Sequence, residues 1–291
     1  MPVYEQGYET YEGERKPISR RWWPLFRQEV VPYFKRRRFI FLLLLALVPW
    51  FYGVALTFLH TQLGDSEAMK ELVGKLPYVD EKLVATLLGN GWDLFLLLIV
   101  CIWVGSGLVA RDRKDKTLEV FLGRGLGAGQ YLWAKGAALG IFLLLFSLVP
   151  TMVLVTFQIG LTGDPGWILA HSRVVWGTLL YTLVGPGATV LFVLALSSLG
   201  RSPRVVGLAL IGIVFFGDIA CGVAYAITRN PAIWFFSLAK ELGLLAHRCL
   251  GAPAPKMLDM NFGLTLLFFA LLAAGSLGVL AVRFSRRGVL R

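Results

Sequence analysis

The stretch that decides the fold is residues 105–136, which read GSGLVARDRKDKTLEVFLGRGLGAGQYLWAKG. This stretch carries nine charged residues, whereas the runs that flank it, 92–110 and 137–161, are strongly apolar. Each flanking run can cross a hydrocarbon layer of ~30 Å at a helical rise of ~1.5 Å per residue. The sequence therefore predicts a polar loop that leaves a membrane and returns to it on the same side.

The composition of the whole chain is that of a membrane protein. Of its 291 residues, 56% are hydrophobic and 16% are charged, whereas soluble domains carry roughly 25% charged residues. The net charge of +11 does not indicate nucleic-acid binding, because the basic residues lie at the ends of apolar runs and not along one polar face. Three cysteines, of which Cys101 and Cys221 lie inside apolar runs, predict neither a disulfide framework nor a zinc site.

We expect an all-α polytopic membrane protein with six transmembrane helices. Residues 1–19 are expected to form a polar tail, residues 20–34 a helix at the membrane interface, and residues 35–291 a domain of six spans. The spans are predicted at about 39–59, 92–110, 137–161, 174–199, 205–227 and 260–282.

The predicted interface helix is amphipathic. Trp22, Trp23 and Phe26 share one face, while Arg27 and Glu29 lie elsewhere on the helix. Tryptophan favours the headgroup level of a bilayer, so this helix is expected to lie on membrane lipid.

The distribution of basic residues predicts the orientation. With six spans both termini lie on one side, and 21 of the 29 lysines and arginines fall on the side of the termini and of the 105–136 loop. Positively charged loops remain in the cytoplasm, so the termini and this loop are expected to be cytoplasmic, in a multi-pass protein of the cytoplasmic (inner) membrane.

Within the loop, Leu118, Phe121 and Leu122 are spaced as one face of a short amphipathic helix. Such a helix between two spans is suited to contact a partner.

The residues of this loop resemble the coupling loop of ABC-2 type exporter permeases. The resemblance rests on the order of an acidic residue, a Thr-Leu-Glu run, a turn and a lysine-glycine pair that opens the next span. Three departures are visible: Lys116 stands where that family commonly has glycine, Gly125 stands near its usual proline, and the closing pair, Lys135-Gly136, is reversed. The residues that the resemblance assigns to coupling are Arg111, Asp112, Thr117, Leu118, Glu119, Phe121 and Leu122.

The resemblance implies a function and partners. The six-span domain would be the permease of an ATP-binding-cassette exporter, paired with a second copy of itself or a homologous permease. ATP and Mg would bind to separate ABC ATPase subunits on the cytoplasmic face, and this chain would hold no cofactor and catalyse no reaction of its own. Lipid, glycan, small hydrophobic compounds and metal-related cargo all remain open as substrates.

Asp218 is singled out because it is an acidic residue inside a predicted span, where a charge costs ~2.5–3.5 kcal/mol. Either it lies on a translocation path or subunit seam, or it is a hydrogen-bonded tie between the fifth span and a neighbour. In the fourth span, Gly185, Pro186 and Gly187 form a candidate hinge, and we expect a kink or partial break there.

The sequence contains no P-loop, no nucleophile elbow and no cluster of cysteine and histidine. The chain is therefore not expected to hydrolyse ATP by the P-loop route. A second hypothesis from another class is a non-transporting membrane anchor or accessory subunit that uses the same loop to dock a partner.

Overall fold

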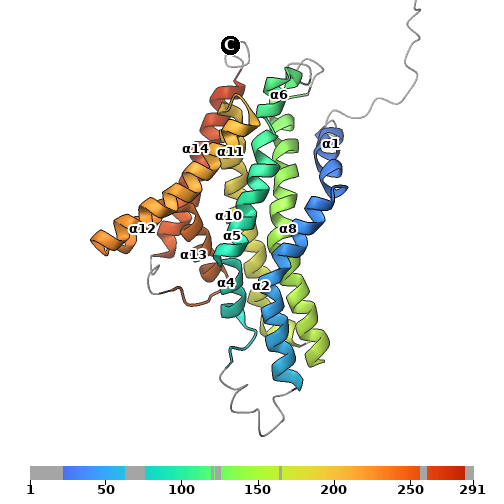
Figure 1. The fold of residues 1–291 in the computed structure, drawn as a ribbon, viewed down its shortest axis with the longest axis vertical. Coiled ribbons are helices and arrows are strands. Elements are labelled where there is room, and N and C mark those ends of the chain that lie inside the picture. Colours follow the sequence, from blue (N-terminus) through green and yellow to red (C-terminus); the bar gives the residue numbers. More distant parts are fainter. Residues whose placement is uncertain are drawn as a thin grey trace, which may run out of the picture.

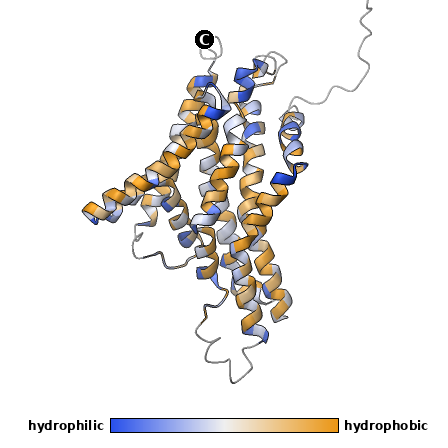
Figure 2. Ribbon diagram, viewed as in Figure 1, coloured by the Kyte–Doolittle hydropathy of each residue, from blue (hydrophilic) through white to orange (hydrophobic). Residues whose placement is uncertain are grey.

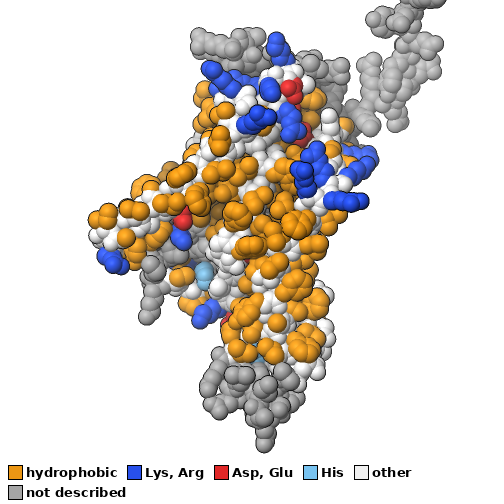
Figure 3. Space-filling model, viewed as in Figure 1, with side chains coloured by type: hydrophobic (Ala, Val, Ile, Leu, Met, Phe, Trp, Pro, Cys, Tyr) orange, Lys and Arg blue, Asp and Glu red, His pale blue; other side chains and the backbone are white. Residues whose placement is uncertain are grey.

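The computed structural model describes residues 22–62, 76–118, 121, 126–163, 166–255 and 261–285. These residues are almost entirely helical and contain no strand. The polar tail predicted at 1–19 lies outside them. Figure 1 shows an elongated bundle, with α1 (Trp22–Phe34), α6 (Ala110–Lys114) and the end of α14 (Phe262–Phe284) at one end. We call this end the basic end, because Figure 3 shows lysine and arginine side chains concentrated there.

Six helical segments are long and apolar enough to cross a membrane, as the sequence predicts, so the chain has the architecture of a multi-pass membrane protein. Figure 2 shows their hydrophobic surface along most of the bundle. The segments are α2 (Arg37–Gln62), Gly91–Lys114, α8 (Ala128–Thr162), α10 (Ser172–Leu199), Pro203–Thr228 and α14 (Phe262–Phe284).

The second, third and fourth spans form the centre of the bundle, and the others lie around it. In the apolar windows of the central spans 56–67% of the residues are buried, against 22–28% in the first, fifth and sixth. Polar side chains join α8 to two of its neighbours: Thr57 of α2 donates to Gln158 of α8, and Ser147 of α8 pairs with Thr182 of α10 at 3.0 Å. Such hydrogen bonds hold helices together where the surrounding lipid offers no partner.

The first helix, α1, forms within the range 20–34, where the sequence predicts a helix. It continues through Pro32 and ends after Phe34, and a short turn separates it from α2. Tyr33 packs edge-on against Phe142 of α8 and Trp103 of the second span. Helix α1 is thus attached to the central spans and does not merely lie on lipid.

The second span is built from three short helices. They are α5 (Gly91–Trp103), the 3₁₀ helix η2 (Gly105–Gly107) and α6. The third span begins at Ala128, nine residues before the predicted 137, so the last part of the predicted loop belongs to a helix. The charge of Lys135 led to the prediction that residues 128–136 belong to the loop. In the structure Lys135 is buried in the bundle.

Among the described residues, four short helices lie in the connections between the spans that are away from the basic end. Asp80 caps α4 (Glu81–Leu88) by accepting a hydrogen bond from the backbone N–H of Leu83. Between the fifth and sixth spans lie the 3₁₀ helix η4 (Pro231–Phe236) and α13 (Leu238–Cys249). The short helix α9 (Trp167–Ala170) joins the third and fourth spans.

The fifth span is irregular and diverges from the bundle. It consists of α11 (Pro203–Ile211), a π-helical turn η3 (Gly212–Phe216) and α12 (Gly217–Thr228). Figure 1 shows α12 leaving the bundle obliquely. Isolated π-helical turns occur frequently at functional sites, because the wider turn redirects the side chains that follow it.

The predicted partial break in the fourth span is not observed. Helix α10 runs without interruption through Gly185, Pro186 and Gly187. A Cβ atom on Gly185 would come within 2.7 Å of Leu242 and 2.9 Å of Leu245, both on α13. The glycine at 185 therefore serves close helix packing, and the α-helical hydrogen bonding tolerates the proline beside it.

The predicted orientation leads to a labelling experiment. Arg113 at the basic end and Lys82 on α4 are both exposed and lie toward opposite ends of the bundle. In a background in which Cys101, Cys221 and Cys249 are alanine, a cysteine at Lys82 should react with an impermeant thiol reagent in intact cells. A cysteine at Arg113 should react only after permeabilisation. Labelling of position 113 from outside, with protection of 82, would invert the topology.

Candidate functional site

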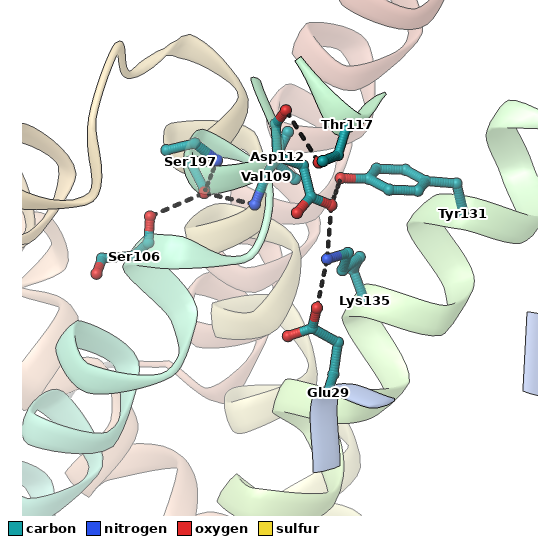
Figure 4. A network of polar contacts seen from close by, with 9 residues as sticks. Glu29, Ser106, Val109, Asp112, Thr117, Tyr131, Lys135 and Ser197 are labelled. Carbon is teal, nitrogen blue, oxygen red and sulfur yellow. Dashed lines mark hydrogen bonds and ion pairs between the residues drawn. The ribbon is translucent and has the colours of Figure 1, made fainter. Parts of the chain in front are cut away.

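The candidate site is the start of the 105–136 loop and the helices that hold it (Figure 4). Ser197, near the end of α10, organises the backbone there. Its hydroxyl oxygen accepts hydrogen bonds from the N–H groups of Val109 and Ala110, each at 3.1 Å, and it donates to the carbonyl of Ser106 at 3.1 Å. One buried hydroxyl thus satisfies three backbone groups where the second span changes from η2 to α6.

Lys135 lies at the centre of the site, with 1% of its side chain exposed. Its Nζ atom is 2.6 Å from Glu29 Oε1 and 2.7 Å from Asp112 Oδ2. Tyr131, one helical turn before Lys135 on α8, donates a hydrogen bond of 2.8 Å to the same oxygen of Asp112. Burial of a lysine is costly, and these charged partners are what makes it tolerable.

The network of Glu29, Asp112, Tyr131 and Lys135, here called the Lys135 network, joins three elements that are far apart in sequence. Glu29 comes from α1, Asp112 from α6, and the other two from α8. Because charge-assisted hydrogen bonds are short and directional, a displacement of α6 must move α1 and α8 or break the network. The start of the loop is therefore mechanically attached to the third span and to the interface helix.

The outward surface of α6 and the residues after it is basic. Arg111, Arg113, Lys114 and Lys116 are exposed, whereas Asp112 is buried. Arg113 donates to the carbonyl of Ser198, and Thr117 donates to the carbonyl of Asp112. The exposed cations are thus presented by a backbone that is itself fixed on the bundle.

The predicted apolar face is only partly described. Leu118 and Phe121 are half-buried and pack against the hydrophobic core of this chain, and Phe121 lies 6.4 Å from the ring of Tyr131. Glu119 and Leu122 lie outside the described residues. The spacing predicts a face for a partner, but two of its three members contact the protein's own bundle.

The aromatic residues of the interface helix form one cluster. Trp23 stacks on Phe26 with ring centroids 5.3 Å apart, and Trp22 meets both rings edge-on. Trp22 and Phe26 also pack against the core, whereas Trp23 is 53% exposed. The helix therefore buries one part of its aromatic face and leaves Trp23 exposed.

The structure supports part of each hypothesis for Asp218. Its Oδ1 atom accepts a hydrogen bond of 2.6 Å from Ser237, the N-cap residue of α13, so it is a tie between two elements. It also lines a cavity, which is treated below.

Two other buried carboxylates escaped the sequence analysis. Asp93, in the first turn of α5, is 6% exposed, and its side chain faces Trp50 and Tyr181 without a hydrogen bond of good geometry. Glu241 on α13 is 0% exposed. Asp93 could have been found from the sequence, since it falls inside the predicted second span. The burial of Glu241 could not, because it depends on how α13 docks.

A large apolar cavity of about 1010 Å³ lies between α8, α10 and α14. Small residues of α8 line it, among them Gly129, Gly136 and Gly140. In the described part of the chain, histidine, cysteine and carboxylate side chains form no cluster of three that could hold a metal ion.

No protein-family model and no curated protein matches this chain.

The backbone at Lys116 gives a first test of the loop. Its φ of 56° lies in the left-handed region, which costs non-glycine residues about 1–2 kcal/mol. Lys116→Gly is therefore expected to raise stability by about 0.5–1 kcal/mol, measured by thermal unfolding in detergent. Lys114→Gly, two residues earlier in α6, is the control and should lower stability by a similar amount. Equal destabilisation by both changes would contradict the assigned backbone.

Glu241 predicts a pH dependence of stability. Helix α13 lies outside the six spans, and burial raises the pKa of Glu241 from 4.5 to about 7, an effect that the nearby Thr265 hydroxyl reduces. The neutral carboxyl is therefore favoured by folding. Its contribution is complete below pH 4.5 and is lost as the pH rises through about 7.

Glu241→Gln should accordingly stabilise the protein at pH 8 by on the order of 2 kcal/mol and change little at pH 5. Burial also lowers the pKa of His247 on the same helix, so stability should fall again in acid for both proteins. The measurement is the unfolding temperature in detergent from pH 5 to 8, with Glu81→Gln on α4 as the control. Parallel profiles for the Glu241 variant and the wild type would refute the assignment.

Proposed function

We propose that this chain is the transmembrane permease subunit of an ATP-binding-cassette exporter, driven by a separate ATPase subunit that docks at the basic end. The observation that carries the proposal is the Lys135 network. It fixes Asp112 of the loop to Lys135 of the third span at 2.7 Å and to Glu29 of α1 through the same ammonium group. A loop attached in this way can pass the movement of a docked partner to the spans.

The backbone of the loop also supports the resemblance. Lys116 adopts the left-handed conformation that glycine adopts most readily, and it stands at the position where ABC-2 permeases commonly have glycine. The residue type departs from the family's pattern, but the backbone at Lys116 is one that glycine adopts readily. The exposed Arg111, Arg113 and Lys114 add a positive surface that can steer a partner with an acidic face.

In this mechanism, two ATPase subunits bind ATP and Mg and close on one another beneath a pair of permeases. The second permease is another copy of this chain or a homologue. Closure pushes on the loop, and the Lys135 network transfers the displacement to α8 and α1. The spans then rearrange so that the substrate can cross.

The test is purification of the chain from its native membrane, followed by an assay for a co-purifying ATPase. Leu122→Asp, on the predicted docking face, is expected to release the ATPase, because burial of a leucine contributes about 1.5–3 kcal/mol and an unpaired buried charge costs more. Leu169→Asp is the matched control, since Leu169 on α9 is 82% exposed and lies outside the loop.

The expected result is an ATPase that is retained by wild type and Leu169→Asp and lost from Leu122→Asp. Retention of an active ATPase by Leu122→Asp would remove the coupling assignment. The absence of any ATPase from the wild-type preparation would favour the anchor hypothesis.

A further inference from the structure

A cavity of about 300 Å³ lies where α12 leaves the bundle, between α5, the π-helical turn and α13. Unlike the larger cavity at the basic end, it is lined by two charged side chains of opposite sign, Asp218 and Lys240. Figure 3 shows acidic and basic atoms interrupting the hydrophobic surface at the base of the oblique helix. Charges on such a surface are costly unless they have a partner or a function.

The two charges do not neutralise each other. No ion pair of 4 Å or less joins Asp218 to Lys240, although both belong to the described residues. Asp218 is held by the hydroxyl of Ser237, while the Lys240 ammonium lies over the indole of Trp234, 5.3 Å from the ring centroid. Each charge thus has its own partner in the protein, and both side chains line the cavity.

Two of the helices around the cavity begin at its wall. Gly91, which begins α5, and Lys240, in the first turn of α13, both line the cavity, so the positive ends of two helix dipoles lie at its wall. The π-helical turn at 212–216 comes immediately before α12 and places Asp218 on the cavity wall. An anion is favoured near Lys240, and a cation near Asp218.

The entrance is apolar. Phe95 and Phe215 line the cavity and are also 52% and 56% exposed on the surface of the spans. In a membrane this surface meets acyl chains. A ligand that satisfies the site must therefore carry a cation and an anion a short distance apart and be joined to an apolar body.

We propose that this cavity binds the headgroup of a zwitterionic phospholipid with a primary amine, of the phosphatidylethanolamine type. The ammonium group donates hydrogen bonds to Asp218, and the phosphate accepts from Lys240 near the starts of α5 and α13. The acyl chains lie against Phe95 and Phe215. This inference does not depend on the transport function, because it rests on the cavity alone.

The experiment is native mass spectrometry of the full chain, purified in detergent and delipidated, with added phosphatidylethanolamine, phosphatidylcholine or phosphatidylglycerol. A trimethylated amine cannot donate hydrogen bonds, and phosphatidylglycerol has no cation. Because hydrogen bonds to charged groups are strong, phosphatidylethanolamine is expected to bind roughly tenfold more tightly than either of the others.

Variants assign the preference to the two charges. Asp218→Asn and Lys240→Gln should each reduce phosphatidylethanolamine binding about tenfold, and Lys240→Arg should retain it in part. Arg229→Gln is the control, because Arg229 is exposed at the end of α12 and does not line the cavity. Unfolding temperatures within a few degrees of wild type establish that the variants are folded, and Asp218→Glu provides a second acidic variant if the asparagine variant fails to fold.

Equal affinities for the three lipids, or a preference that survives both charge-removing variants, would overturn the proposal. Equal binding of phosphatidylglycerol that depends on Lys240 alone would also overturn it, since the site would then recognise only an anion. Water-soluble glycerophosphoethanolamine should fail to displace the lipid at equal concentration. Displacement as effective as that by the lipid would exclude a membrane source for the ligand.

Discussion

Replacement of Lys135 by methionine is expected to destabilise the protein by about 3–5 kcal/mol, because it leaves two carboxylates buried without their cation. Glu29 and Asp112 lie 2.6 and 2.7 Å from the Lys135 ammonium, and only 1% of the lysine side chain is exposed. The measurement is the unfolding temperature of the purified protein in detergent. Lys114→Met, at an exposed lysine of α6, should change stability by no more than about 0.5 kcal/mol.

A compensated variant separates packing from charge. In Lys135→Met combined with Glu29→Gln and Asp112→Asn, no buried charge remains, and much of the lost stability should return. If the network transmits force, this variant should still bind the ATPase but hydrolyse ATP without transport. A triple variant no more stable than Lys135→Met alone would show that the lysine contributes by its shape and not by its charge.

The number and positions of the spans were predictable from the sequence because lipid imposes a simple rule. A span must be long, apolar and helical, since a membrane offers no other partner for backbone groups. The predicted fourth and sixth spans differ from α10 and α14 by only two residues at either end. A helix at the position of α1 could also be predicted from the sequence, because its aromatic residues recur at helical spacing.

The sequence-based predictions were wrong where a tertiary contact overrides the conformation that the local sequence favours. Lys135 indicates a loop when it is considered alone, but its two carboxylate partners allow it to lie inside α8. Pro186 indicates a break, but α10 continues through it and packs closely on α13 at Gly185. Neither outcome can be derived from residues near in sequence, because Glu29 and α13 are distant from the positions that they affect.

The candidate site, too, could be predicted from the sequence only in part. The loop motif identified Asp112 and Thr117, and the amphipathic pattern of α1 identified Glu29, but nothing in the sequence indicated that Glu29 and Asp112 share one lysine. Ser197, which holds three backbone groups of the loop, was not identified at all. A serine at the end of an apolar helix is too common to be recognised without the structure.

The contact between α10 and α13 predicts a second substitution with a large effect on stability. Gly177 and Gly185 lie two helical turns apart on the face of α10 that meets α13, with the buried Tyr181 between them. A Cβ atom on Gly177 would lie 2.7 Å from the carbonyl oxygen of Cys249 and 3.1 Å from the Cα atom of Leu250. These are backbone atoms, so they cannot yield by a change of rotamer.

Gly177→Val is therefore expected to destabilise the protein by about 3 kcal/mol or more and to displace α13 from α10. Gly160→Val on α8 is the matched control, because a Cβ atom there meets nothing within 4 Å. Two measurements check this: the unfolding temperature in detergent, and the rate at which Cys249 reacts with a thiol reagent in a Cys101→Ala, Cys221→Ala background. The rate should rise in Gly177→Val alone, because displacement of α13 uncovers a cysteine that is only partly exposed in the docked helix. If the two valine variants unfold at the same temperature and label at the same rate, the close approach of α10 and α13 is not what holds α13 in place.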